Sequence, residues 1–359
     1  MNHTNINCLP VPTWNQCGVN AAPAAAALPA GPADDWGEAD FALTLPAGVG
    51  EAESGFTLFP ESGMGAEVDA YFLKNATIRH ALTVAEHTKV AEPAVLEATL
   101  SAAHPNALSV LEIDAKADSS LTVVQVVRGD AENGVSGNLT RIRAAEGARI
   151  KLVQVQLLGS QSRRWNAVAI DAAKTAKVEQ VRIELGGLLA AAGTRAVLPE
   201  SRSEYDLDAL YFGQGESVLD FNDVSVHTGK DTLCEMHTAG VLTGRADKIL
   251  RGTIDFRRGA KRGVGHESED VLLFSPEVRN RTTPLILCGE EEVEGQHAAS
   301  IGRLDDAKLY YLRSRGLSEA QARRLMVEAR FAPAIEKIPL DALREEVQNE
   351  VARRLDHAE

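Results

Sequence analysis

The feature that most constrains the fold is a repeat in the middle of the chain. Five apolar runs each end in a glycine, and successive glycines are 30, 27, 27 and 27 residues apart; the runs are 121–129, 150–159, 178–186, 205–213 and 233–240. A period in the range of about 20 to 50 residues is typical of solenoids and other arrays. Within the runs, Val181, Ile183 and Leu185 alternate with polar residues, which indicates half-buried strands.

Further strands fit between these runs, at 166–171, 193–198 and 217–226, which gives two or three strands per repeat. This arrangement favours a parallel β-helix, in which each coil is one turn of stacked strands and glycine allows the tight corner. The alternative is a β-sandwich or jelly roll with a chance spacing. Aromatic residues make up only 5% of the chain, which fits many short strands better than a large aromatic core. The sequence therefore predicts a mainly β fold.

The residues ahead of the repeat have a different pattern. Residues 36–104 are mixed, with candidate strands at 55–59 and 68–73. Residues 1–35 combine a short anchor, in which we expect Trp14 to dock elsewhere on the protein, with a flexible Ala/Pro-rich linker. The predicted division of the chain is a 1–35 extension, a 36–104 mixed region, a 105–312 β-helix core and 313–359 C-terminal helices.

Behind the repeat the periodicity becomes helical. Ser318 and Gln321 form a capping box, and the helix that they begin is expected to run to about Phe331, because Pro333 would disrupt a continuation. A second helix is expected from near Pro339, with one apolar stripe formed by Leu340, Leu343, Val347, Val351 and Leu355. This stripe is most simply a packing face within the chain, because the end of a solenoid needs a cover.

Charge and composition exclude several classes of function. A net charge of −14 argues against a nucleic-acid partner. The four cysteines, at 8, 17, 234 and 288, have no tight spacing, and free thiols imply a reducing compartment. No apolar run of about 18 residues is present, and the Ala/Pro-rich segment lacks the basic flank of a signal peptide. We therefore expect a cytoplasmic protein with no membrane partner. Without GxxxxGK[ST] or GxSxG, it is not expected to bind ATP itself or to use a serine nucleophile.

Metal-binding residue types gather near the end of the predicted core. Cys288, Glu292, Glu294 and His297 fall within ten positions, together with Glu290 and Glu291. A thiolate, carboxylates and an imidazole suit iron or zinc. The alternative is an acidic solvated loop with one buried cysteine and one surface histidine. A second pair, Cys234 and His237, is three residues apart and so is expected on opposite faces of a strand.

The same region carries a family resemblance. His297, the run 299–305 (ASIGRLD), the segment 311–316 (YLRSRG) and the helix that follows are similar to the C-terminal core of the SufB/SufD family, the scaffold proteins of the SUF iron–sulfur cluster assembly machinery. The N-terminal stretch 9–14 (LPVPTW) also resembles SufD-type N-termini. The resemblance implies a right-handed parallel β-helix that is not an enzyme and that carries a transient iron–sulfur cluster.

The resemblance also implies partners and ligands. His297 matches the histidine that SufD-type proteins contribute where a cluster is thought to assemble. Gly295 stands where some SufD proteins have a cysteine, and Leu312 stands where SufB has its essential cysteine. Cys288 is therefore the expected substitute, with Glu292 and Glu294 as oxygen ligands.

The C-terminal helices of the family bind SufC, an ABC ATPase, and the β-helix end pairs with a SufB/SufD-type paralogue or a second copy. The basic run 251–262 would contribute to that dimer surface. A β-helix polysaccharide lyase or hydrolase is the alternative function. The choice between homodimer and heterodimer, the type of cluster, the sulfur donor and any flavin requirement stay open.

Overall fold

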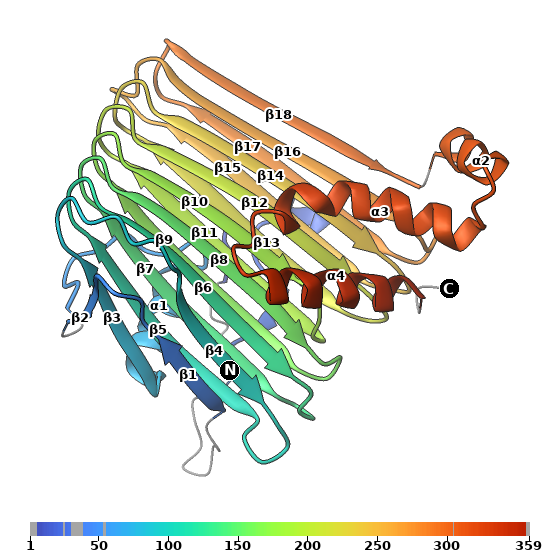
Figure 1. Ribbon diagram of the computed structural model, residues 1–359. Helices are drawn as coiled ribbons and strands as arrows, with labels where there is room; N and C mark the ends of the chain where they lie inside the picture. Colours follow the sequence, from blue (N-terminus) through green and yellow to red (C-terminus); the bar gives the residue numbers. More distant parts are fainter. Residues whose placement is uncertain (1–5, 24–25, 30–38, 53–54, 304, 357–359) are drawn as a thin grey trace.

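The fold is built from two long sheets that face each other (Figure 1). A computed structural model describes residues 6–23, 26–29, 39–52, 55–303 and 305–356. One sheet has the order β1 (Asp40–Thr44), β4 (Ala94–Leu100), β6 (Ser120–Gly129), β8 (Arg149–Leu158), β10 (Lys177–Glu184), β12 (Glu204–Gly213), β14 (Leu233–Leu242), β16 (Gly263–Leu273) and β18 (Val293–Gly302). The other has β17 (Arg279–Cys288), β15 (Asp247–Phe256), β13 (Val218–His227), β11 (Leu189–Leu198), β9 (Arg163–Ala172), β7 (Val135–Ala144), β5 (Asn106–Ala115), β3 (Ile78–Val84) and β2 (Val49–Glu51).

The chain alternates between the sheets, so each coil contributes one strand to each sheet. From β3 to β18 the neighbours within a sheet are parallel and in register, whereas β1 and β2 pair antiparallel with β4 and β3. The five apolar runs of the repeat lie side by side as β6, β8, β10, β12 and β14, and the strands expected between them are in β9, β11 and β13. The predicted parallel solenoid is therefore confirmed, with two strands per coil.

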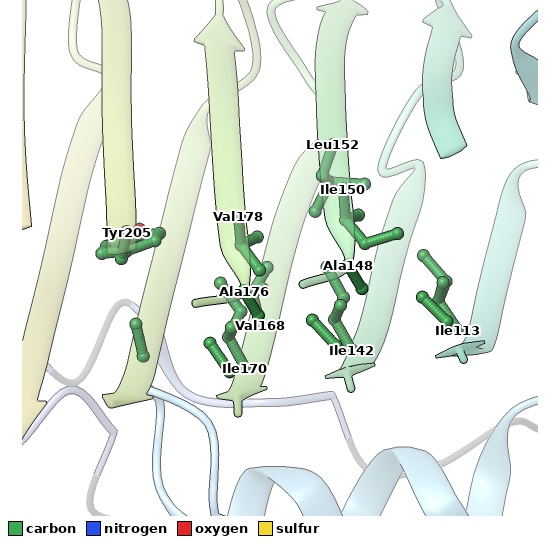
Figure 2. Close-up of a cluster of buried hydrophobic side chains, with 14 of the residues drawn as sticks. Ile113, Ile142, Ala148, Ile150, Leu152, Val168, Ile170, Ala176, Val178 and Tyr205 are labelled. Carbon is green, nitrogen blue, oxygen red and sulfur yellow. The ribbon is translucent and has the colours of Figure 1, made fainter. Parts of the chain in front are cut away.

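The space between the sheets is filled by the inward side chain of every second residue. Figure 2 shows apolar side chains from both sheets pointing toward one another, among them Ile113, Ile142 and Ile170 on one side and Ile150 and Val178 on the other. All five are at most 2% exposed. Burying each such side chain contributes about 1.5–3 kcal/mol, and stacking coils multiplies that contribution along the solenoid.

The corners of the coils are formed differently from the prediction. A column of residues with left-handed backbone repeats once per coil, and its members are His87, Asp118, Gly147, Thr175, Arg202, Asp231 and Arg262. Each N–H in this column donates to a carbonyl of the next coil, as Asp118 does to Glu146 at 2.8 Å. Six of the seven are not glycine. Of the five glycines that end the apolar runs, only Gly129 has a positive φ, whereas Gly240 instead leaves room for the ring of Tyr211, whose nearest ring atom would lie 2.0 Å from a Cβ.

Three helices follow the last strand: α2 (Asp306–Ser314), α3 (Glu319–Ile335) and α4 (Asp341–Asp356). In Figure 1, α3 and α4 cross the outer face of the sheet of even-numbered strands, and α2 lies beyond the end of β18. Val327 and Phe331 of α3 and Val347 and Val351 of α4 pack there, so the predicted apolar stripe of α4 is confirmed as a packing face. None of the described helices is long and apolar enough to cross a membrane.

The capping box that begins α3 is confirmed, since Ser318 and Gln321 each accept from the other's backbone N–H. The predicted end near Phe331 is wrong, because Pro333 lies inside α3. The helix continues beyond the proline because Ala334, Ile335 and the following Ile338 are buried against the sheet.

The predicted strands in the mixed region are wrong. Residues 68–73 lie in α1 (Ala66–Asn75), where Val68 and Phe72, four residues apart, are buried against the outer face of the odd-numbered sheet. Residues 55–59 form no strand; Phe56 stacks on Phe59, and both rings cover the Arg141 guanidinium. The parallel ladder itself begins at Ile78, within this region.

The N-terminal segment 6–22, here called the strap, runs along the outer face of the odd-numbered sheet. Ile6, Leu9 and Val19 are buried there, but Trp14 is 76% exposed beside the short helix η1 (Asn15–Cys17), so the prediction that Trp14 docks is wrong. Within the expected linker, Ala26 is buried and its carbonyl accepts from Trp165 Nε1 at 2.9 Å. Residues 1–5, 24–25 and 30–38 of the extension and linker lie outside the described residues, as does Leu304 of the family-like segment.

A buried ion pair fixes the strap to the solenoid. Asp220 of β13 and Arg251 of β15 are both fully buried and join through two hydrogen bonds, of 2.9 and 3.2 Å. Asn7 Nδ2 donates to Asp220 Oδ1 at 2.6 Å, and Arg251 Nε donates to the Val19 carbonyl at 2.5 Å. One charge pair therefore holds both arms of the strap.

Candidate metal-binding site

The last coil, formed by β17 and β18 and here called the terminal coil, leaves the solenoid open at this end. Within the part of the chain that the structure describes, β18 pairs only with β16 and β17 only with β15, so each presents an unpaired edge. The residues of β18 are exposed or half-buried. An edge strand with free N–H and C=O groups can pair with a strand of another chain.

His297 lies in the middle of β18 on its inward side. It is in register with Glu267 of β16, and parallel neighbours in register project to the same face. Gly295, two residues earlier, lies on the same face of β18 as His297. A Cβ at Gly295 would lie 2.9 Å from Ile286 Cγ2 of β17, so this face points inward. The imidazole is nevertheless exposed, because no further coil among the described residues covers it.

Cys288 is the last residue of β17 and also lies on the inward side. It is in register with Phe256, which is fully buried in the core, yet Cys288 is exposed because it belongs to the terminal coil. Cys288 and His297 therefore share one face of one coil. Cys288 stands at the turn and His297 at mid-strand, so the two are separated along the coil.

Glu292 and Glu294 are placed differently. Glu294 is three residues from His297 and so lies on the outer face, where its Oε1 is 3.4 Å from His266 Nε2 and accepts from Gln296 Nε2 at 2.7 Å. Glu292 lies in the turn before β18, 3.9 Å from Lys261 Nζ. Among the described residues, no three His, Cys, Asp or Glu side chains are grouped so that they could hold a metal together.

A charged cluster that the sequence reasoning missed lies in the interior beneath the terminal coil. Glu269 is 2% exposed; it pairs with Lys248 and accepts from Tyr211 Oη at 3.1 Å and from Thr282 Oγ1 at 2.5 Å. Asp223 receives two hydrogen bonds from Arg182, of 2.6 and 2.7 Å. Burial lowers the pKa of Lys248. These groups satisfy one another, as buried charges must.

Glu267 belongs to the same cluster but is not satisfied. It is 6% exposed, and its Oε2 has no hydrogen-bond partner among the described residues. Its carboxylate crosses the interior to Gly252 of β15, where a Cβ would lie 1.7 Å from Oε1. Burial, reinforced by the charges of Asp223 and Glu269, raises the pKa of Glu267 to about 8.

The basic run 251–262 combines a buried arginine with exposed cations that are partly paired with carboxylates. Arg251 is buried against Asp220, Arg257 pairs with Asp255, and Arg262 pairs with Asp231. Asp220 and Asp231 come from the preceding coil, whereas Asp255 is on the same strand as Arg251. The contribution of this run to a dimer surface stays a prediction.

The second sequence motif behaves as expected. Cys234 is fully buried on the inward side, where burial raises the pKa of its thiol, and His237 is half-buried with Nδ1 2.9 Å from Ser268 Oγ of β16. The prediction that the two residues lie on opposite faces is confirmed.

The fold and the site define a parallel β-solenoid whose open end presents an exposed imidazole and an exposed thiol. The family model described as SUF system FeS cluster assembly, SufBD core domain, matches residues 98–330, so the chain belongs to this family.

Relatives agree with this assignment. The chain is 29% identical over 150 residues to the iron–sulfur cluster assembly protein SufD of Bacillus subtilis, which is 42% of this chain and 34% of that protein. It is 32% identical over 136 residues to a SufBD family protein of Pyrococcus horikoshii, 38% of this chain and 30% of the relative. A SufBD family protein of Mycobacterium bovis is 26% identical over 286 residues, 77% of this chain and 71% of the relative. The chain thus spans about a third of the length of the first two.

Proposed function

We propose that this chain is a scaffold subunit for iron–sulfur cluster assembly that works as a dimer together with a SufC-type ATPase. The observation that carries the proposal is the open terminal coil with His297 and Cys288, in a chain of the SufBD core-domain family. In this proposal the cluster is the cargo of the protein. His297 would supply a nitrogen ligand and Cys288 a sulfur ligand. The polysaccharide lyase or hydrolase alternative has no comparable support.

The dimer contact is proposed at the edge of β18. Its unpaired backbone groups can extend the sheet into a second subunit, either another copy or a paralogue. Ile301, which is 45% exposed on this strand, would be covered by that contact. An iron–sulfur cluster takes four protein ligands. A dimer would bring ligands from two terminal coils together, in keeping with the single thiol and single imidazole that each coil offers.

The ATPase contact is proposed on α2 and α3. Tyr310 and Tyr311 of α2 and Leu325 of α3 are 76, 55 and 46% exposed, and α2 stands away from the solenoid beyond β18 (Figure 1). Exposed aromatic and aliphatic side chains grouped on helices are typical of protein-binding surfaces. The buried face of α3 and α4 is occupied by the sheet, so α2 and the outer side of α3 are the surfaces left for a partner.

The test is anaerobic co-expression with the ATPase and related genes encoded beside this chain, followed by pull-down and by iron and sulfide analysis. We expect the ATPase to co-purify with wild type and the cluster to be lost in His297→Ala and in Cys288→Ser. The matched controls are His237→Ala, a half-buried histidine on the outer face, and Cys17→Ser, an exposed cysteine of the strap. A cluster that survives both site substitutions would exclude these residues as ligands, and failure of the ATPase to bind would reject the assembly role.

Two further variants separate the two proposed contacts. Ile301→Lys places a charge on the β18 edge and should abolish the dimer while the ATPase still binds. Tyr310→Ser combined with Leu325→Ser should release the ATPase and leave the dimer intact. Light scattering and pull-down measure the two properties separately, and a variant that loses both would show that the surfaces are not independent.

A further inference from the structure

The interior beneath the terminal coil contains a carboxylate that its surroundings do not satisfy. Glu267 is 6% exposed. Among the described residues, its Oε2 has no hydrogen-bond partner and no cation lies within ion-pair distance of it. Its neighbour Glu269, two residues along the same strand and on the same face, has three partners. The contrast shows that this part of the interior can supply hydrogen-bond and ion-pair partners to a buried carboxylate, and that it supplies none to Glu267 Oε2.

Such an arrangement opposes folding. Buried polar groups are nearly always hydrogen-bonded, and a buried charge without a partner is costly. Asp223 and Glu269, both nearby, add unfavourable charge of the same sign, which the charge of Lys248 opposes. Destabilising groups of this kind tend to be retained where a function uses them.

The position of Glu267 indicates what that function is. In the row of inward residues along the even-numbered sheet, Met236 precedes Glu267 and His297 follows it. Met236 is 3% exposed and closes one side, whereas His297 is in the open terminal coil. Adjacent parallel strands are about 4.8 Å apart. Gly252 on the opposite sheet leaves room for the carboxylate, and His297 is the neighbour of Glu267 in this row that belongs to the open terminal coil.

We propose that Glu267 and His297 together bind a divalent cation of the iron(II) class at the open end of the solenoid. Glu267 provides a carboxylate oxygen and His297 an imidazole nitrogen, a combination that suits Fe²⁺ and similar transition-metal ions. The two ligands leave coordination positions free for water or for the cargo. The inference rests on the proposed function in one respect, the metal-facing role of His297, and it adds an interior ligand beyond Cys288, Glu292 and Glu294.

The experiment titrates the purified full-length chain with Co²⁺ and with Fe²⁺ under anaerobic conditions, without any partner. Co²⁺ bound to the protein is followed by its visible absorption. We expect saturable binding by wild type, weakened about ten-fold or more by Glu267→Gln and also by His297→Ala. Glu235→Gln, at an exposed carboxylate on the outer face, serves as the matched control and should bind as wild type does. Binding by Glu267→Gln that equals wild type overturns the proposal.

Thermal unfolding distinguishes a ligand from a structural residue. Without metal, Glu267→Gln should melt at the same temperature as wild type or higher, because it removes an unpartnered carboxylate. Saturating Co²⁺ should raise the melting temperature of wild type and not that of the variant. Glu267→Met, which repeats the residue at Met236 in the same row, is the second variant. If both substitutions prevent folding, Glu267 is a structural residue and the proposal fails.

The result is separable from the test of the proposed function. Glu267→Gln leaves the β18 edge, α2 and α3 unchanged, so pull-down of the ATPase and the dimer should be unaffected. Failure of wild type to bind the ATPase, with intact Co²⁺ binding, would reject the assembly role and keep the metal site. Normal partner binding with no Co²⁺ binding by wild type would reject the metal site alone.

Discussion

Replacing Arg251 by methionine should be among the most destabilising single substitutions on the outer face of the odd-numbered sheet. The change leaves the Asp220 carboxylate fully buried, with Asn7 Nδ2 as its remaining side-chain donor, and removes the hydrogen bond to the Val19 carbonyl. Removing one partner of a buried ion pair costs about 3–5 kcal/mol. Burial already raises the pKa of Asp220, so the carboxyl can take up a proton, and we expect the lower end of this range, about 3 kcal/mol.

The assay is urea unfolding, compared with that of Arg257→Met. Arg257, in the turn after the same strand, is 56% exposed in its pair with Asp255, and the loss of such a surface pair costs about 0–1 kcal/mol. Limited proteolysis should also cut the strap of Arg251→Met sooner. The double variant Asp220→Leu/Arg251→Met should be more stable than the sum of the single losses predicts, because no charge is left unpaired. If Arg251→Met stays within 0.5 kcal/mol of wild type, roughly the effect of an ordinary surface substitution, the reasoning about the strap is wrong.

Three further predictions concern single features. Gly240→Ala should destabilise the fold by about 1–3 kcal/mol in thermal unfolding, since its Cβ would lie 2.0 Å from the Tyr211 ring; an unchanged melting temperature would contradict the packing described. His227 is buried, and its pKa is lowered from 6.5 to about 4 by desolvation, so between these values the unfolded chain binds a proton that the folded chain excludes. The free energy of unfolding should therefore fall as pH drops through this window, by up to about 3 kcal/mol, and the fall should be shallower in His227→Gln. Ser318→Ala should remove about 1 kcal/mol from the start of α3, seen as faster amide exchange in its first turn; equal exchange rates would show that the capping box contributes nothing.

The sequence predicted the solenoid because the repeat reports a local property. Each apolar run is a strand of the even-numbered sheet, and the constant period is the length of chain that one coil needs to return to register. The corners could not be read in the same way. Six of the seven left-handed corner positions carry side chains, such as Thr175 and Arg202, so no glycine marks them.

The flanking regions were harder because tertiary contacts decide them. The stretch 68–73 has strand-like composition, yet it is helical because Val68 and Phe72 then face the sheet together. Pro333 is tolerated in α3 because the helix is held by burial on both sides of it. Trp14 is exposed because the strap is fixed by the buried ion pair and by its small apolar residues, which sequence pattern alone does not reveal.

The candidate site was predictable in its residues and not in its arrangement. The family resemblance pointed to His297, and the position of Cys288 nine residues earlier made it a natural companion. Which face each residue occupies depends on register, and register separates Glu294 from His297. Glu267 gave no signal, because the stretch HESED (266–270) is polar at every position and so resembles a solvated loop, although its alternate residues are buried.

The one-sided pairing of β18 has a mechanical consequence. The hydrogen bonds of β18 join it to β16 on one side. A pull along the strand loads all of these hydrogen bonds at once, whereas a pull away from the sheet breaks them one pair at a time. The chain passes from Gly302 into α2 within a few residues, so a displacement of that helix is delivered directly to the strand's last pair. The direction in which α2 moves would therefore determine whether the edge holds firm or peels, and the end of β18 farthest from the Cys288 turn would open first.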